Sequence, residues 1–175
     1  MRKVTYGAAA SFDGYLAGRE EALDWLLWSD DAAAISGDSW KGVDTILMGR
    51  KTYEFAAKSG GGSEEPSSIA GYVFSRTMTE APKGAELVKG DAVEFVRELK
   101  SRPGGDIIVM GGGELGSALL DGGVVDEIGF NLHPLLLGDG TPMFRPMEHR
   151  VALELIEARA IAKGCVFLRY KVLND

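Results

Sequence analysis

One stretch decides the fold of this chain: Ile107-Ile108-Val109-Met110-Gly111-Gly112-Gly113-Glu114-Leu115-Gly116. Its first four residues predict a buried strand, and Leu115 to Leu120 predicts a helix directly after the glycines. Gly111, Gly113 and Gly116 satisfy the pattern G-x-G-x-x-G in the strand-to-helix context that this pattern requires. Because glycine has no Cβ atom, the backbone can approach a pyrophosphate closely, and a helix N-terminus stabilises its charge. The stretch therefore predicts a pyrophosphate site in an α/β fold; the alternative is that these glycines serve only a tight turn.

Strand-like and helical segments alternate on both sides of this stretch. Strands are predicted before it at Val4–Ala10, Asp44–Met48 and Tyr72–Phe74. Helices are predicted within Glu21–Ile35, where Leu23, Leu26 and Leu27 have helical spacing, and over Thr52–Lys58 and Ala92–Leu99. After it come a strand at Val124–Leu132, a loop over 135–142, and an antiparallel hairpin of Ala152–Ile161 and Val166–Val172. We expect a three-layer α/β domain over residues 1–175, with a mostly parallel central sheet flanked by helices, a C-terminal antiparallel hairpin, and an internal loop at Gly60–Pro66.

Composition excludes several classes of protein. The chain has 175 residues, and 19 Lys and Arg against 26 Asp and Glu give a net charge of −7. This acidic balance argues against binding to nucleic acid or to an anionic membrane, since both require a basic surface. A single cysteine, Cys165, excludes an internal disulfide and a cysteine-based zinc cluster, and we expect no metal site. The N-terminal apolar stretch is too short for a signal peptide or a membrane span, so we expect a cytoplasmic protein.

A second candidate anion site is Met48-Gly49-Arg50-Lys51-Thr52-Tyr53, at another predicted strand-to-helix turn. The helix macrodipole disfavours Arg50 and Lys51 there by a few tenths of a kcal/mol each, and a bound anion would reverse that cost. The alternative is that both are solvated surface charges. The turn is not a Walker A loop, because it lacks the earlier glycine of that motif.

The third candidate is Phe74-Ser75-Arg76-Thr77, where one guanidinium stands between two hydroxyl groups. This arrangement suits a phosphate monoester, although an ordinary polar loop would have the same composition. No acidic residue for a ribose hydroxyl group stands about 20 positions after the triple glycine; Asn131 and His133 occupy that region. The three turns together predict a dinucleotide that carries a 2′-phosphate, namely NADPH.

These motifs, in this order, resemble the dihydrofolate reductase-like superfamily. Within it the chain is most similar to the reductase domain at the C-terminus of bifunctional riboflavin-biosynthesis deaminase–reductases and to their stand-alone relatives. The segments that carry the resemblance are Ala9–Ala17, Met48–Glu54, Phe74–Thr77, Gly111–Leu115 and Pro134–Phe144. One cysteine cannot supply the zinc site of the deaminase half, and the Trp loop of true folate reductases has no counterpart here.

The resemblance implies that residues of the first strand and of the three turns bind NADPH. They are Ala9, Ala10, Gly49, Arg50, Lys51, Thr52, Ser75, Arg76, Thr77, Gly111, Gly112, Gly113, Glu114, Leu115 and Gly116. In this scheme Ala9 or Ala10 faces the nicotinamide, and the turn around Arg76 holds the 2′-phosphate. The candidates for the walls of a substrate pocket are Asp24, Trp25, Tyr53 and Phe144. The implied activity is reduction of 5-amino-6-(5-phosphoribosylamino)uracil or of another small heterocyclic or carbonyl compound, by a homodimer.

Hydride transfer requires orientation of the two reactants and at most one proton donor. Asp24, beside Trp25, is the candidate donor, on the expectation that burial beside an aromatic ring makes the carboxylate more basic; alternatively it only caps or decorates a helix. A phosphoribosyl substrate would need a second basic cluster, for which Arg145 or Arg150 is the candidate, whereas a pocket without a spare cation would favour a neutral carbonyl substrate. The alternatives are an NADPH-binding protein without turnover and a dihydrofolate reductase, whereas a flavin-binding module has no specific support beyond the glycine-rich turn.

Overall fold

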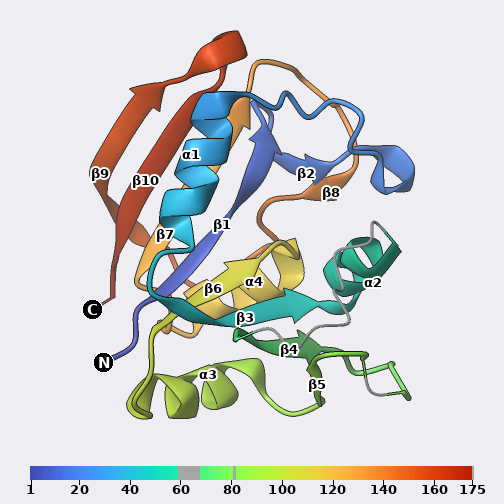
Figure 1. The fold of residues 1–175 in the computed structure, drawn as a ribbon, viewed down its shortest axis with the longest axis vertical. Coiled ribbons are helices and arrows are strands. Elements are labelled where there is room, and N and C mark those ends of the chain that lie inside the picture. Colours follow the sequence, from blue (N-terminus) through green and yellow to red (C-terminus); the bar gives the residue numbers. More distant parts are fainter. Residues whose placement is uncertain (59–67, 81, 175) are drawn as a thin grey trace.

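The computed structural model of the chain describes residues 1–58, 68–80 and 82–174. Its central feature is an eight-stranded sheet in the order β5-β4-β3-β6-β1-β7-β10-β9 (Figure 1). In that order the strands span Glu86–Val88, Ala70–Phe74, Val43–Gly49, Asp106–Met110, Val4–Ser11, Glu127–His133, Val166–Leu173 and Ala152–Ala160. Neighbouring strands from β5 to β7 are parallel, whereas β10 runs antiparallel to both β7 and β9. The predicted mostly parallel sheet with a C-terminal antiparallel hairpin is confirmed.

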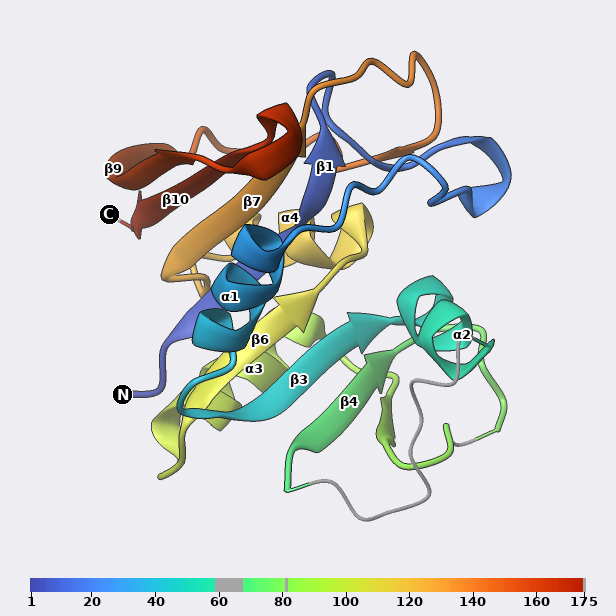
Figure 2. The ribbon, with the colours of Figure 1, turned by 45° about the horizontal axis from the view of Figure 1, so that its top comes forward.

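Helices cover both faces of the sheet (Figures 1 and 2). Helix α1 (Asp30–Ser39) lies over one face, and α3 (Ala92–Ser101) and α4 (Gly113–Asp121) lie over the other. Helix α2 (Arg50–Lys58) follows β3 at the carboxyl end of that strand. The three-layer α/β architecture is therefore confirmed. No described helix combines the length and the apolar composition that are needed to cross a bilayer.

One face of β1 belongs to the hydrophobic core. Val4 and Tyr6 are fully buried on the face that packs against α4. The Tyr6 hydroxyl donates a hydrogen bond to the Met143 carbonyl oxygen at 2.8 Å, which satisfies its polar atom, and burial raises the pKa of Tyr6. A Cβ atom built on Gly116 would lie 2.4 Å from the Tyr6 ring, so this position must be glycine for α4 to pack closely on the sheet.

Helix α1 begins later than the leucine spacing predicts. Ser29 is its N-cap, and the Ser29 hydroxyl accepts a hydrogen bond from the Ala32 backbone N–H at 3.2 Å. Glu20 and Glu21 have left-handed backbone angles, with φ of 55° and 62°, and the chain between them and Ser29 is irregular. The prediction of a helix that includes Leu23, Leu26 and Leu27 is therefore wrong. Their spacing reflects packing of an irregular segment.

Several short elements were not predicted. Strand β2 (Tyr15–Ala17) pairs with β8 (Thr141–Pro142) in a separate two-stranded sheet, and β5 extends the edge of the main sheet. Two 3₁₀ turns, Arg19–Glu21 and Ala162–Gly164, complete the elements of the described residues. The predicted loop at Gly60–Pro66 lies outside the described residues.

Asp13 ties the first loop to the segment that precedes β8. Its carboxylate accepts backbone hydrogen bonds from Leu137 at 3.1 Å and from Gly138 at 2.8 Å. The Ser11 hydroxyl donates to the same carboxylate at 2.6 Å, and these hydrogen bonds hold the pKa of Asp13 below its ordinary value. The β2–β8 sheet therefore has a fixed place at the carboxyl end of β1.

Candidate functional site

The glycines between β6 and α4 have different structural roles. Gly111 and Gly112 adopt left-handed backbone angles, with φ of 56° and 80°, which favour glycine. A Cβ atom on Gly113 would lie 2.2 Å from the Pro142 carbonyl oxygen, so this glycine permits β8 to pack on the start of α4. Gly112 is the N-cap of α4 and offers no side-chain cap to the first-turn N–H groups. The start of α4 is thus suited to hold an anion with its backbone.

The β3–α2 turn lies directly against this one. A Cβ atom built on Gly112 would lie 3.8 Å from the Gly49 Cα atom, and one built on Gly111 would lie 3.0 Å from Thr52 Oγ1. By contrast, a Cβ atom on Gly49 would have no described atom within 4 Å outside its chain neighbours. Two of the three predicted anion sites are therefore adjacent, with open space beside Gly49.

The third turn reaches the same place through Arg76. Its Nη2 atom lies 2.6 Å from Glu114 Oε1, in the first turn of α4. The Ser75 hydroxyl accepts the Met78 N–H at 3.0 Å, which shapes the turn after β4. The turn after β4 leads to strand β5 and not to a helix, so only two of the three turns open a helix. All three turns nevertheless meet at the carboxyl ends of neighbouring parallel strands.

Each cation of these turns already has a carboxylate partner. Arg50 Nη1 lies 2.9 Å from Glu54 Oε1, and Lys51 Nζ lies 2.7 Å from Glu21 Oε1. Arg76 pairs with Glu114 as described above. These side chains are all at least 40% exposed, so each pair contributes only about 0.2–1 kcal/mol. An incoming phosphate can displace such partners at small cost.

A cavity of about 360 Å³ lies between α1 and the sheet. Its floor consists of alternating residues of β1, β6, β7 and β10, and its other side is formed by residues 26–28 and by α1. Ala9 lines this cavity, whereas Ala10 is fully buried on the opposite face of β1. Of the two alanines, only Ala9 is therefore placed to face a ring bound in the cavity.

The four residues proposed as substrate walls do not line the described cavity. Phe144 packs edge-on against Tyr6 and Phe130 in the core, because it lies on the other side of the sheet. The Tyr53 hydroxyl accepts the Lys83 N–H at 2.7 Å, which directs it away from the cavity. Asp24 is exposed, so the burial on which its predicted basicity depends is absent.

Trp25 is nevertheless close to the cavity through His133. Its ring meets the His133 ring edge to face, with centroids 5.1 Å apart. His133 is only 2% exposed and lines the cavity together with Asn131. Asn131 is the register partner of Ala9, and His133 lies two residues further along β7. The sequence places Asn131 and His133 at the end of this strand, and it left open whether His133 lines the pocket or makes a structural hydrogen bond. The structure shows both, since His133 lines the cavity and its Nδ1 atom lies 3.1 Å from the Asn131 carbonyl oxygen.

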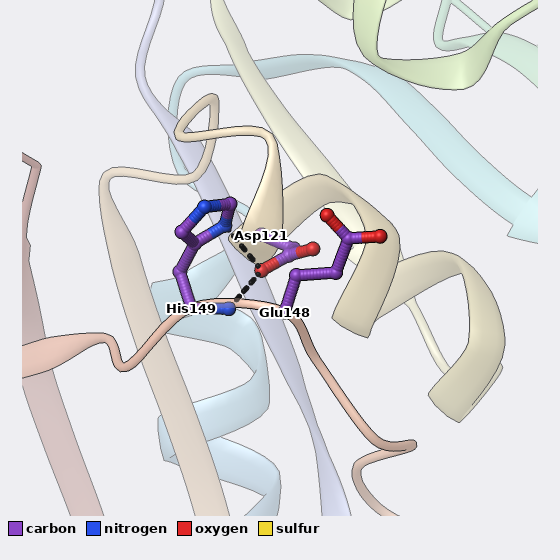
Figure 3. Close-up of side chains that lie close together, drawn as sticks. All are labelled: Asp121, Glu148 and His149. Carbon is purple, nitrogen blue, oxygen red and sulfur yellow. Dashed lines mark hydrogen bonds and ion pairs between the residues drawn. The ribbon is translucent and has the colours of Figure 1, made fainter.

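Asp121, Glu148 and His149 form a cluster that no sequence spacing suggests (Figure 3). Asp121 Oδ1 accepts the His149 backbone N–H at 2.9 Å and lies 3.1 Å from His149 Nδ1. The backbone hydrogen bond from His149 is the main reason that the pKa of Asp121 lies below its ordinary value. The contacts fasten the segment after β8 to the end of α4, and they account for Asp121 without a bound metal ion.

Comparisons with known proteins identify the family of this chain and the fold that it shares with solved structures. The profile of the RibD C-terminal domain family matches residues 2–167. The uncharacterized protein YyaP of Bacillus subtilis (strain 168) is 31% identical over 180 residues, which cover 97% of this chain and 95% of that protein. The crystal structure of a candidate riboflavin biosynthesis protein from Shewanella sp. PV-4 has a TM-score of 0.84 and 26% identity, with 98% and 99% of the two chains covered. Dihydrofolate reductase from Enterococcus faecalis, complexed with NADP(H), has the same fold, with a TM-score of 0.72, 16% identity and coverage of 99% and 97%.

Proposed function

Because this chain belongs to the RibD C-terminal domain family, with a dihydrofolate reductase-like fold, we propose that it is an NADPH-dependent reductase of a small heterocyclic or carbonyl substrate. The family and the similar structures are of the reductase type, so oxidoreductase is the broad class. The observation that carries the finer proposal is the meeting of three turns, which together contain three cations, at the carboxyl ends of β3, β4 and β6.

The residues of this edge fit a dinucleotide phosphate. The bare backbone of Gly111 and Gly112 and the uncapped first turn of α4, formed by Gly113, Glu114 and Leu115, would hold the pyrophosphate. Gly116 is not a donor to it, because its N–H group donates to the Gly112 carbonyl oxygen at 2.9 Å. Arg50, Lys51 and Thr52 would contact it from the adjacent turn, and the open space beside Gly49 leaves room for it. Ser75, Arg76 and Thr77 would hold the 2′-phosphate, which would replace Glu114 as the partner of Arg76.

When bound, NADPH supplies a hydride, which is added to the carbon of a C=O or C=N bond while a proton goes to the heteroatom. The chain must therefore hold a proton near the cavity. We assign this task to His133 in place of Asp24, because His133 is buried at the cavity and Asp24 is exposed. The Asn131 carbonyl oxygen, 3.1 Å from His133 Nδ1, can only accept a hydrogen bond, so Nδ1 carries a hydrogen. The remaining ring atom, Nε2, is then the one that can hold and release a proton.

A second copy of the chain is the proposed partner. Strand β9 is an edge strand, and it exposes Leu153, Leu155 and Ile156 by 41%, 55% and 43%. An edge strand with large exposed apolar side chains is a site of pairing between chains, and two-fold dimers are the commonest soluble assemblies. We therefore propose a homodimer that buries β9.

The proposal is tested by titrating the protein with NADPH and NADH in a calorimeter and then following NADPH oxidation with candidate substrates. We expect NADPH to bind more tightly than NADH, since Arg76 would form a charge-assisted hydrogen bond with the 2′-phosphate, a group that NADH lacks. Equal or better affinity for NADH would refute the cofactor assignment. Tight NADPH binding with no oxidation for any heterocyclic or carbonyl compound would favour the alternative of a binding protein without turnover.

A further inference from the structure

The cavity between α1 and the sheet has a floor without side chains at its centre. Gly7 of β1 and Gly129 of β7 are register partners, and both line the cavity. A Cβ atom on Gly7 would lie 2.5 Å from the Gly129 carbonyl oxygen, so the two backbones are packed closely there. A flat ring can lie directly on this backbone, beside Phe167 of β10, whose ring is 3.7 Å from a Cβ atom built on Gly129.

Aromatic and aliphatic side chains form most of the remaining walls. The apolar side chains that line the cavity are Leu26, Leu27, Trp28, Ile35, Trp40, Val43, Ile108, Met110 and Phe167. Asn131 contributes a polar edge, and its Oδ1 atom has no hydrogen-bond partner. An unpartnered buried polar atom is destabilising, and a hydrogen-bond donor of a ligand would satisfy it after a small movement of the side chain.

The charged groups of the cavity neutralise one another. Three cations line its described part, and each has a carboxylate partner: Lys3 lies 3.4 Å from Glu127, Lys41 lies 2.7 Å from Asp38, and Arg169 lies 3.7 Å from Glu157 and 4.0 Å from Glu127. Asp106 adds a third lining carboxylate, 3.8 Å from Lys3. The Nε–H group of Arg169 is buried without a hydrogen-bond partner, so this guanidinium can still donate to an oxygen atom of a ligand. The charges of the described lining nevertheless balance, so the cavity has no net positive charge for an anionic substrate.

The two arginines that the sequence offered for a phosphoribosyl group lie elsewhere. Neither Arg145 nor Arg150 lines the described cavity, and both side chains belong to exposed residues. The Arg145 N–H donates to the Ser117 hydroxyl at 2.8 Å, which fixes this segment to α4, on the opposite face of the sheet. A phosphate dianion in the cavity would have to give up its hydration without gaining an unpaired cation.

We propose, on the basis of the reductase function proposed above, that the substrate is a neutral, flat aromatic carbonyl compound without a phosphate group. It lies on the Gly7–Gly129 floor between α1 and the sheet, with its polar edge toward Asn131 and His133. The cofactor phosphates then occupy the three turns, and the cavity itself accepts no anion.

Isatin and isatin-5-sulfonate provide a matched pair of probes, since both are flat aromatic carbonyl compounds and differ by one sulfonate group. We expect calorimetry without cofactor to show that isatin binds and that the sulfonate binds at least about tenfold more weakly. Sulfonate binding as tight as that of isatin, or displacement of isatin by ribose 5-phosphate, would overturn the proposal. So would failure of both probes to bind.

Gly129→Val adds a side chain inside the cavity, and we expect the fold to be retained. A Cβ atom there meets only the Phe167 ring at 3.7 Å and the Leu168 carbonyl oxygen at 4.0 Å, which are ordinary contacts. We expect isatin affinity to fall by about tenfold or more, with a smaller loss for Gly129→Ala, because the added carbons occupy the space over the floor. Gly37→Val is the control, since Gly37 lies on α1 outside the described lining and a Cβ atom there meets nothing within 4 Å.

NADPH titration of the same proteins separates this inference from the proposed function. We expect Gly129→Val to lower NADPH affinity less than isatin affinity, because the cofactor phosphates bind at the turns beyond Met110, the register partner of Gly7, and not on the floor itself. Unchanged isatin binding in Gly129→Val would show that the probe binds elsewhere and would overturn the inference. Failure of the wild-type protein to bind NADPH would refute the proposed function, whichever way isatin behaves.

Discussion

Replacement of Arg76 by alanine is the most direct test of how the cofactor is recognised. In the free protein Arg76 lies 2.6 Å from Glu114, with the two side chains 84% and 74% exposed, so this pair is worth only about 0.2–1 kcal/mol. A charge-assisted hydrogen bond to the 2′-phosphate is worth about 1.5–3 kcal/mol. Binding exchanges the first interaction for the second. The net loss for NADPH in Arg76→Ala is then about 0.5–2.8 kcal/mol, or roughly 2- to 100-fold in affinity.

Calorimetry at low salt with NADPH and NADH measures this effect. We expect NADH affinity to stay within about twofold, since NADH has no 2′-phosphate for Arg76 to contact. The matched variant Glu114→Gln removes the competing carboxylate and should raise NADPH affinity by up to about fivefold. Equal weakening of both cofactors by Arg76→Ala would refute the assignment of Arg76 to the 2′-phosphate.

Three further predictions concern the turns, the assembly and acid stability. Gly49→Val should weaken NADPH binding at least about tenfold while changing the free energy of unfolding by less than about 1 kcal/mol, because the added side chain enters open space. Gly112→Val would be harder to interpret, since a β-branched residue disfavours the φ of 80° at that position. Unchanged NADPH affinity in Gly49→Val would show that the pyrophosphate binds elsewhere. Light scattering at micromolar concentration should give a dimer for the wild-type protein and 18.7 kDa for Leu155→Glu, and a wild-type mass of 18.7 kDa would disprove the dimer. Because its pKa is lowered in the folded state, the Asp121 carboxylate stabilises the fold above the ordinary carboxyl pKa, and this stabilisation is lost as the pH falls through the folded pKa. Urea unfolding should therefore show that Asp121→Ala lowers the free energy of unfolding at neutral pH and lowers it progressively less in acid. A difference that does not change with pH would contradict the role given to the hydrogen bonds with His149.

Much of the fold follows from local patterns in the sequence. The first strand, predicted at Val4–Ala10, is observed at Val4–Ser11, and the helix predicted at Ala92–Leu99 is observed at Ala92–Ser101, because both have a clear hydrophobic period. The order of the eight strands could not be predicted, since the parallel pairs are joined by long crossovers. The start of α1 was missed because the Ser29 cap competes with three well-spaced leucines upstream.

The three turns could be predicted from the sequence, whereas the cavity could not. The three turns were predictable because each follows a strand directly and has a recognisable composition: a run of glycines in one, and a cation beside glycine or hydroxyl groups in the other two. The cavity was not predictable as a unit, since its lining comes from alternate positions of four strands, such as Gly7 and Gly129, which meet only through register. The balance of charge that argues for a neutral substrate is likewise a property of the assembled sheet.

The pairing of Arg50, Lys51 and Arg76 with carboxylates has a kinetic consequence. At distances of more than about 10 Å, the carboxylates offset the electrostatic potential of these cations. The net charge of −7 then determines the electrostatic force on an approaching nucleotide. The protein therefore repels the polyanion that it is proposed to bind, and attraction begins only after contact, when a phosphate replaces a carboxylate. Added salt screens this repulsion, so the rate of encounter rises with ionic strength, opposite to the behaviour of a basic nucleotide site.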